Sequence, residues 1–475
     1  MFHKFLCAIS RTSAETRLAA VAGVIGAANI WGALLVAMVA VWRYCRRVPL
    51  DFSRGLAFWF FAPTAITLVF IGMGKLLPDD DLLRHLTAGG LSFDYRAQYP
   101  WSELPKANLW LGFDWALWQL QSLGLSKEFL RQWLPALSLV LQSLVLFFAL
   151  KRMLPAHRQN PSLLLLCGAL GMLLLTPRSV LGRPEMFILI FAACAWLPRS
   201  IMGVLAWITG FLILIPSYWL GWAYAPFALL LWRARLSLVQ RVGIAAGLGL
   251  AHLGFWQWYT GDYLQLMVWL KGTLSVKATE NRDLLYAFYT YAGFVLLGLL
   301  TFAASVLNRQ RLIASASVVM LFAWFAIPNQ IRYLAALSFI ALPWLYRQFT
   351  IWSTARSLSI PPVVVLLALG AAGLCVTATP TVPTFALKAA DRVYSESPYA
   401  TVFFGQKGIS VDPSFALGAT KAPWDGLKKS TKEAEHCQLL REGGFTHVVE
   451  MSRNSLLECG ELVQVQGAWR LWRLK

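Results

Sequence analysis

The sequence predicts an all-α polytopic membrane protein with about 12 transmembrane helices and a small C-terminal α/β domain outside the membrane. Three observations favour this fold class. Of the 475 residues, 58% are hydrophobic and only 14% are charged, whereas soluble domains carry about 25% charged residues. The mean hydropathy is +0.57. The apolar residues are gathered into long runs, and the composition turns polar only after residue 378. A water-soluble globule and a disordered chain are therefore excluded.

Twelve apolar runs are candidate transmembrane helices, because crossing a bilayer takes about 20 apolar residues. Residues 1–17 lack the small-residue cleavage site of a signal peptide, so the first run is expected to be a retained span. Prolines interrupt the stretch 184–232, which can be read as two helices or as three. The runs cover residues 18–42, 56–74, 132–150, 162–176, 186–197, 201–215, 222–232, 242–255, 286–307, 312–327, 333–346 and 358–376.

The charges between the runs predict the orientation, because short cytoplasmic loops accumulate Lys and Arg. One set of alternating loops holds 15 basic residues and a single acid, Asp51. We expect this set to be cytoplasmic and both termini to be outside, although the N-terminal tail is itself basic. The placement of basic residues in cytoplasmic loops then explains much of the net charge of +19. No nucleic acid partner is expected, because no polar segment interleaves Lys and Arg with aromatic residues. The set comprises residues 43–55, 151–161, 198–200, 233–241, 308–311 and 347–357.

The polar tail predicts a separate domain. The transmembrane domain is expected to cover residues 1–378, including a first extracytoplasmic loop at 75–131, and the soluble domain residues 379–475. Hydrophobic patterning in the tail predicts a helix ended by two glycines and three following strands. The predicted elements are the helix 433–442 and the strands 445–451, 462–465 and 469–474.

Cys437 and Cys459 are the only cysteines in this tail. An oxidising compartment would let them brace a domain with little core. The alternative is two free, buried thiols. No spacing of Cys and His resembles a zinc site.

The first outside loop carries three consecutive carboxylates, Asp79, Asp80 and Asp81. Their mutual repulsion raises the pKa of at least one of them, which suits the group to accept a proton or to hold a cation. If a helix begins at Asp81, His85 lies on the same face. The alternative is that an Asp merely caps this helix. Later in the loop, residues 110–123 form an amphipathic stretch typical of an interfacial helix.

Four segments, in this order, resemble bacterial polytopic glycosyltransferases of the GT-C superfamily. Residues 79–89 and 113–115 are similar to the D-x-D-x-x-x-H-x-x-x-G and (E/D)-W patterns of the family's first loop. Residues 182–187 resemble its Arg-Pro-x-x-Phe segment, and residues 439–449 resemble the close of its tail. The family's Asn and His after the sixth span are replaced here by the sequence 217–219.

This resemblance implies an inverting hexosyl- or pentosyltransferase, similar to mannosyl- and arabinosyltransferases, in the bacterial cytoplasmic (inner) membrane. The donor would be a polyprenyl-phosphate-linked sugar, and the acceptor a cell-envelope glycan, a lipid or a protein on the outer face. The catalytic carboxylate would be Asp79 or Asp81, with Asp80, His85 and Asp114 binding substrate. Some members use a divalent cation near such acids and others do not, so Mg²⁺ or Mn²⁺ stays open.

The chemistry of sugar transfer fits these residues. A hydroxyl nucleophile needs a base as it attacks C1, and the leaving phosphate needs cations or donors at the membrane surface. Arg183 and Arg332 stand at outside ends of predicted spans, where guanidinium groups can bind phosphate oxygens. Glu185 would pair with Arg183 or bind sugar hydroxyls. For each arginine the alternative is snorkelling to the interface. Arg178, Lys271, Lys277 and Arg282 are second-rank candidates.

Two other functions compete with this one. A polyprenyl-diphosphate-dependent glycan ligase or polymerase would be expected to rely on Arg and His in large outside loops, without an acidic cluster in the first loop. A transporter of a lipid-linked substrate would be expected to show repeated halves and charges in the middle of its spans. The sequence shows neither repeated halves nor charges in the middle of the spans, and the glycan ligase or polymerase stays an alternative.

Overall fold

The structure is a computed structural model of the chain. It describes residues 52–53, 55–73, 82, 85–86, 110–261, 263, 331–355, 360–374, 385, 391, 393–394, 433–451, 459–466 and 469–475.

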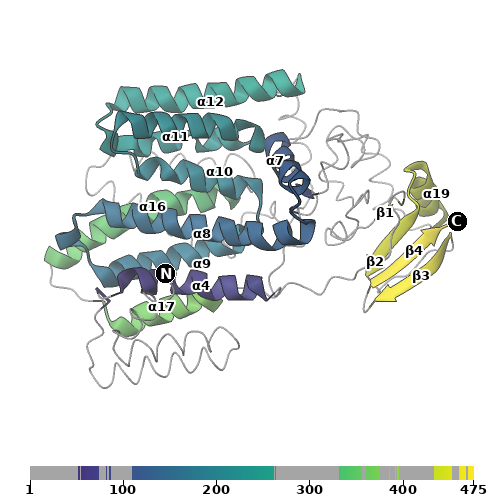
Figure 1. Ribbon diagram of the computed structural model, residues 1–475, viewed down its shortest axis with the longest axis horizontal. Coiled ribbons are helices and arrows are strands. Elements are labelled where there is room, and N and C mark those ends of the chain that lie inside the picture. Colours follow the sequence, from purple (N-terminus) through teal and green to yellow (C-terminus); the bar gives the residue numbers. More distant parts are fainter. Residues whose placement is uncertain are drawn as a thin grey trace.

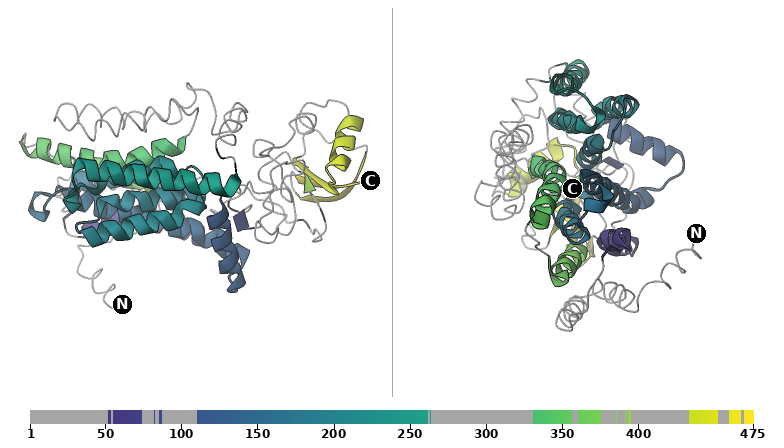
Figure 2. Two further views of the ribbon diagram at one scale, coloured as in Figure 1. Left: turned by 90° about the horizontal axis from the view of Figure 1, so that it is seen from above. Right: turned by 90° about the vertical axis from the view of Figure 1, so that its left-hand side faces the viewer.

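Most of the described residues are helical, and the longer helices lie side by side with roughly parallel axes (Figures 1 and 2). One shorter helix, α7 (Leu111–Ser122), crosses the others at one end, which we call the α7 end. The helices of the bundle are α4 (Leu56–Gly72), α8 (Lys127–Met153), α9 (Pro161–Ser179), α10 (Pro184–Ala193), α11 (Ile201–Leu214), α12 (Leu238–Thr260), α16 (Ile331–Ala355) and α17 (Pro362–Leu374).

Helix α8 is the buried centre of the bundle. Ser126 caps its N-terminus by accepting a hydrogen bond from the Phe129 N–H, and Glu128 lies in the first turn. Lys151 and Arg152 lie in the last turn, so charges at both ends complement the helix dipole. Its 27 residues extend about 40 Å, which exceeds the apolar thickness of a bilayer.

Small residues let α9 pack closely against its neighbours. A side chain at Gly168 would collide with the Phe60 ring of α4, and one at Gly171 would collide with Leu146 of α8. Thr64 of α4 and Ser143 of α8 share a buried hydrogen bond of 2.7 Å. Close approach of helix backbones at small residues, with polar side chains bonded between helices, is typical of packing within membranes.

Other helices carry apolar side chains on their outer faces. Only 11% of the apolar window of α12 is buried, against 67% for α8. Met202 and Ile213 of α11 are 73% and 70% exposed. Contiguous apolar surface of this kind is unfavourable in water and suits contact with lipid. By length and composition, α8 and α12 can each cross a membrane, and the described chain adds several shorter apolar helices.

Between residues 127 and 260 the chain runs back and forth between the two ends of the bundle. At the α7 end, Gly112 of α7 packs against Pro216, in the turn η4 (Ile215–Ser217) that follows α11. At the opposite end, the Arg152 guanidinium donates to the Leu197 carbonyl. The end of α8 at Arg152 therefore lies beside the segment that joins α10 to α11.

Several predicted runs are confirmed as helices, but the helices begin or end at other residues than predicted. Helix α8 begins at Lys127, so the predicted loop 75–131 ends five residues earlier, because Ser126 caps the helix there. Helix α16 continues to Ala355 through most of the predicted loop 347–357. The helix continues beyond the end of the apolar run at residue 346, so hydropathy alone places the C-terminal end of this helix too early. The runs 18–42, 286–307 and 312–327 lie outside the described residues.

The proline-rich stretch 184–232 forms three helical segments. These are α10, α11 and the 3₁₀ segment η5 (Gly221–Ala234), which contains Pro226 and a non-helical backbone at Leu231. A proline within a helix removes a backbone donor and clashes with the preceding turn. The predicted third helix is therefore present as 3₁₀ turns.

The tail confirms the predicted helix and strands. Helix α19 (Glu433–Glu442) has the predicted bounds and is followed by a turn with Gly444, whose φ of 68° suits glycine. Strands β2 (His447–Met451), β3 (Gly460–Gln466) and β4 (Trp469–Leu474) follow. A two-residue strand that was not predicted, β1 (Val393–Tyr394), pairs in parallel with β2 and gives the order β1-β2-β4-β3.

The predicted bond between Cys437 and Cys459 is confirmed. The two residues form a disulfide with a Cα–Cα distance of 6.0 Å, within the usual range. The bond joins α19 to the turn before β3, across 22 residues of sequence. It therefore holds the helix and the edge strand of a small sheet together.

Removing this disulfide is expected to destabilise the tail. Cys459→Ser should lower its stability by about 3 kcal/mol, because closing a loop of this length restricts the unfolded chain by that amount in the chain-entropy model. Protease susceptibility of the tail in the full-length, unreduced protein measures the effect. Cys437→Ser should have the same effect, and the double variant should add almost nothing to either. A double variant twice as destabilised as the singles would contradict a shared bond.

Candidate active site

A buried histidine and a buried aspartate form a close pair at the α7 end. His85 belongs to a helical stretch of the first loop, and Asp114 lies in the first turn of α7. His85 Nδ1 is 2.5 Å from Asp114 Oδ1, and their side chains are 1% and 5% exposed. A carboxylate accepts hydrogen bonds, so the Nδ1–H of His85 donates to it, which fixes the tautomer and the orientation of the ring.

Aromatic rings surround this pair and connect it to α10. The His85 ring meets Trp110 and Phe113 edge to face, at centroid distances of 5.4 and 5.2 Å. Phe113 in turn lies 5.9 Å from Phe187 of α10. The aromatic contacts thus join the first loop, the start of α7 and the segment 182–187.

An apolar cluster holds these segments together. We call it the junction cluster; it contains side chains from the first loop, from α7 and from the start of α8, with Phe187 packed against it. Segments that are a hundred residues apart in the sequence are therefore neighbours in the fold. Its buried members are Leu82, Leu86, Phe113, Leu117, Leu130 and Leu134.

Gly182 makes the approach of α10 to this cluster possible. Its φ is 61°, a left-handed conformation that favours glycine. A side chain there would come within 2.9 Å of Leu82 and 3.3 Å of Pro135. Arg183 follows in an extended conformation, and Pro184 occupies the first turn of α10, where its missing N–H is tolerated.

Two arginines share one glutamate beside this turn. Arg178 Nη1 and Arg183 Nη1 lie 3.7 and 3.8 Å from Glu185 Oε1. The three side chains are only 12%, 11% and 4% exposed. The two guanidinium groups and the carboxylate thus lie together at the edge of the apolar bundle. Guanidinium groups are the side chains that bind phosphate oxygens in a fork.

The base of this charged group is anchored to α8. Ser179 donates a hydrogen bond to the buried Gln142 of α8, and the Gln142 amide donates to Met172 Sδ at 3.5 Å. The last turn of α9, which carries Arg178, is therefore fixed to the bundle. This fixed position limits the movement of the arginine backbone.

The turn after α11 and the end of α12 also reach the α7 end. A side chain at Gly112 would meet Pro216 at 2.8 Å and the Ser217 amide nitrogen at 3.1 Å. Tyr259, in the last turn of α12, interacts electrostatically with Asp114. The segment 217–219, which differs from the family pattern, therefore borders the same place.

The predicted site residues fall into two groups. The structure pairs His85 with Asp114, and joins Arg183 and Glu185 to Arg178, a second-rank candidate. The acids Asp79, Asp80 and Asp81 lie outside the described residues, as do Lys271, Lys277 and Arg282. Arg332 belongs to α16, but its side chain is not described.

Sequence reasoning missed Gly182 and the shared role of Glu185. The signal for the glycine was present, because Gly-Arg-Pro-Glu combines a turn residue with a helix start. Within the described residues, no group of three or more His, Cys, Asp and Glu side chains could hold a metal ion.

Comparison of the chain with models of known protein families and with curated proteins gives no match. The functional interpretation therefore depends on the geometry described above and on the sequence patterns.

Proposed function

We propose that this protein is an integral membrane glycosyltransferase of the GT-C type. It transfers a sugar from a polyprenyl-phosphate-linked donor to an acceptor on the outer face of the bacterial cytoplasmic membrane. One observation carries the proposal. Three segments each resemble a motif of the family: residues 79–89, 113–115 and 182–187. The described parts of these segments meet around the junction cluster, at one end of an apolar helix bundle.

The proposed membrane arrangement has about 12 spans, of which α8 and α12 meet the length criterion by themselves. Its orientation is supported by charge. From the junction cluster at Leu130 to Arg152, α8 rises roughly 30 Å, the apolar thickness of a bilayer. Between the described helices 127–260, the connections at the opposite end, 151–161, 198–200 and 233–241, contain seven Lys and Arg residues and no acid. This excess of basic over acidic residues favours a cytoplasmic location for that end.

The proposed reaction is a single displacement with inversion. Asp79 or Asp81 removes the proton from the acceptor hydroxyl as its oxygen attacks C1 of the sugar. The bond between C1 and the phosphate oxygen breaks, and its electron pair leaves with the polyprenyl phosphate. A positioned carboxylate accelerates such proton transfers by about 10²–10⁴-fold.

The arginines on either side of the turn between α9 and α10 suit the leaving group. A phosphate ester carries more negative charge as it departs, and fixed cations stabilise this charge best where water is scarce. Arg178 and Arg183 are mostly buried and lie beside Glu185, which holds their positions. Phosphate oxygens and two guanidinium groups form short, charge-assisted hydrogen bonds.

The His85–Asp114 pair is proposed to position the first loop. His85 follows Asp81 by four residues, a spacing that brings both to one face of a helix. Its ring is held by Asp114 and by two aromatic neighbours. A fixed ring at this place restrains the backbone of the acidic segment, so it acts through position and need not touch the reacting atoms.

Sided membrane vesicles test the proposal. Right-side-out vesicles from cells that express the protein are expected to transfer radiolabelled sugar from one of a panel of polyprenyl-phosphate-linked sugars to endogenous acceptor, with inversion at C1. Vesicles from cells lacking the protein are the control. Activity that requires a nucleotide sugar as the direct donor, or that occurs only on the cytoplasmic face, would contradict the proposed function.

A further inference from the structure

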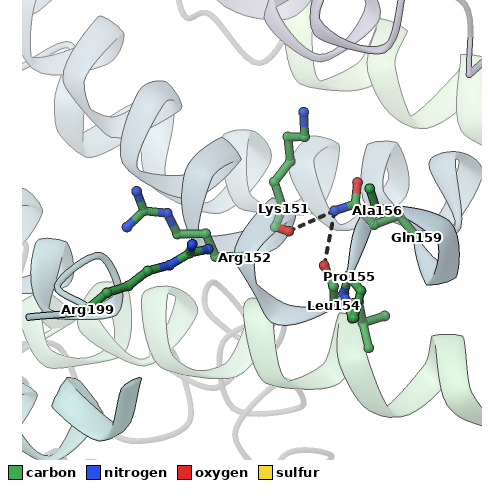
Figure 3. A pocket seen from close by; sticks show the side chains of 7 residues that line it. All are labelled: Lys151, Arg152, Leu154, Pro155, Ala156, Gln159 and Arg199. Carbon is green, nitrogen blue, oxygen red and sulfur yellow. Dashed lines mark hydrogen bonds between the residues drawn. The ribbon is translucent and has the colours of Figure 1, made fainter. Parts of the chain in front are cut away.

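A cationic pocket lies at the end of the bundle opposite to α7. Its volume is 360 Å³, within the range of sites for small ligands. The lining combines the last turn of α8, the short turn η2 (Ala156–Arg158) with its flanks, and the segment before α11 (Figure 3). The lining residues are Lys151, Arg152, Leu154, Pro155, Ala156, Gln159 and Arg199.

Three of the seven lining side chains are cations, and none is an acid. The Arg152 and Arg199 side chains lie together in Figure 3, whereas Lys151 extends its ammonium separately. Arg152 and Arg199 repel each other electrostatically. Two adjacent like charges without a carboxylate in the lining are unfavourable unless an anion lies between them or water screens them.

A glutamine side chain binds backbone carbonyls of the pocket wall. The Gln159 amide donates to the carbonyls of Lys151 and Leu154, at 2.8 and 3.1 Å. These bonds satisfy exposed carbonyls at the end of α8, so the cationic side chains are the donors left for an anion. Lys151 Nζ lies 5.4 Å from the centroid of the Phe147 ring, which restrains its long side chain.

Apolar side chains that face outward flank the cations on both sides. Phe148 of α8 is 44% exposed, and Ile201 and Met202 of α11 are 56% and 73% exposed. Arg199 precedes Ser200, the N-cap of α11, and the N-terminus of this helix adds a positive dipole end. The pocket thus places cations beside surface that suits acyl chains.

We propose that this pocket binds the phosphoryl group of an anionic phospholipid from the cytoplasmic leaflet. Arg152 and Arg199 would hold the phosphate oxygens through charge-assisted hydrogen bonds, while the acyl chains lie along Phe148 and Ile201. A soluble phosphate shares the headgroup chemistry but cannot use the apolar flanks. This site rests on the membrane orientation proposed above and is independent of sugar transfer.

Thermal stabilisation of the full-length protein in detergent tests the site, because a bound ligand raises the apparent stability with its concentration. The probes are phosphatidylglycerol, phosphatidylcholine and inorganic phosphate. Phosphatidylglycerol is expected to stabilise the protein at lower concentration than either of the others. Arg199→Gln should weaken this binding about tenfold, the loss of one charge-assisted contact.

Arg158→Gln is the matched control, because Arg158 is an exposed cation of η2 that does not line the pocket. It should leave the affinity for phosphatidylglycerol unchanged.

Arg199 is the better residue to replace. It is exposed as well, so its replacement tests the site without disturbing the bundle, whereas Arg152→Gln also removes the bond to the Leu197 carbonyl. Equal stabilisation by both lipids, or equal binding by Arg199→Gln and the unchanged protein, would overturn the site. Inorganic phosphate as effective as phosphatidylglycerol would overturn the lipid as its source.

Discussion

Asp81→Asn or Asp79→Asn is expected to abolish sugar transfer while leaving the protein inserted in the membrane. An amide has nearly the shape of the carboxylate but cannot take the proton of the acceptor hydroxyl. Loss of a general base lowers a rate by about 10²–10⁴-fold, the largest effect expected of any single replacement in this chain. The initial rate of transfer in right-side-out vesicles, at equal amounts of inserted protein, measures the effect.

Glu128→Gln is the control for this experiment. Glu128 is an exposed acid in the first turn of α8, at the same end of the bundle. Its replacement removes a favourable interaction with the helix dipole, an effect of about 0.3–1 kcal/mol, and should leave transfer unchanged. Full activity in both Asp79→Asn and Asp81→Asn would remove the proposed base, and with it the proposed mechanism.

Local signals explain which elements were predictable. Helix α19 has its predicted bounds because an amphipathic pattern ends at two glycines, Gly443 and Gly444. Strand β1 has two residues, too few for any alternating pattern. It is a strand only because Val393 and Tyr394 pair with His447 and Val448, about 50 residues later. Pairing over such a distance leaves no periodic mark in the sequence.

Hydropathy predicted where helices lie better than where they end. The start of α8 depends on the Ser126 hydroxyl, which accepts from the Phe129 N–H, and on charged residues that a hydropathy window discards. The third segment of the stretch 184–232 is apolar enough to be predicted as a helix. The conformation of that segment, η5, follows from Pro226 and from the backbone at Leu231, which apolar composition does not encode.

The candidate site was predictable as a set of residues and not as a set of contacts. Each of His85, Asp114, Arg183 and Glu185 stood in a recognisable local pattern. Their pairing depends on how α7 crosses the bundle and on how closely Gly182 lets α10 approach Leu82. These features arise from packing between distant segments. Arg178 was ranked low because nothing within α9 reveals that its guanidinium lies 3.7 Å from the Glu185 carboxylate.

Asp114→Ala is expected to lower the transfer rate about a hundredfold, the effect of a displacement of about 1 Å among reacting groups. The replacement leaves the buried His85 N–H without its carboxylate at 2.5 Å, and breaking a buried, charge-assisted bond costs about 1.5–3 kcal/mol. The first loop would then lose its fixed position. Because the pair acts by positioning, kcat should fall while KM for the donor changes little.

Asp114→Asn tests whether Asp114 acts by holding the His85 ring in place or by its negative charge. The Asn carbonyl can still accept the His85 Nδ1–H, so this variant should keep most of the activity that Asp114→Ala loses. Ser122→Ala, at an exposed position of the same helix α7, controls for damage to the helix. Equal loss in the Asn and Ala variants would show that the negative charge of Asp114 is required in the reaction itself, and the positioning role would then be wrong. Rescue by Asn would instead support a positioning role for the pair, because the Asn carbonyl keeps the hydrogen bond to His85 without the charge.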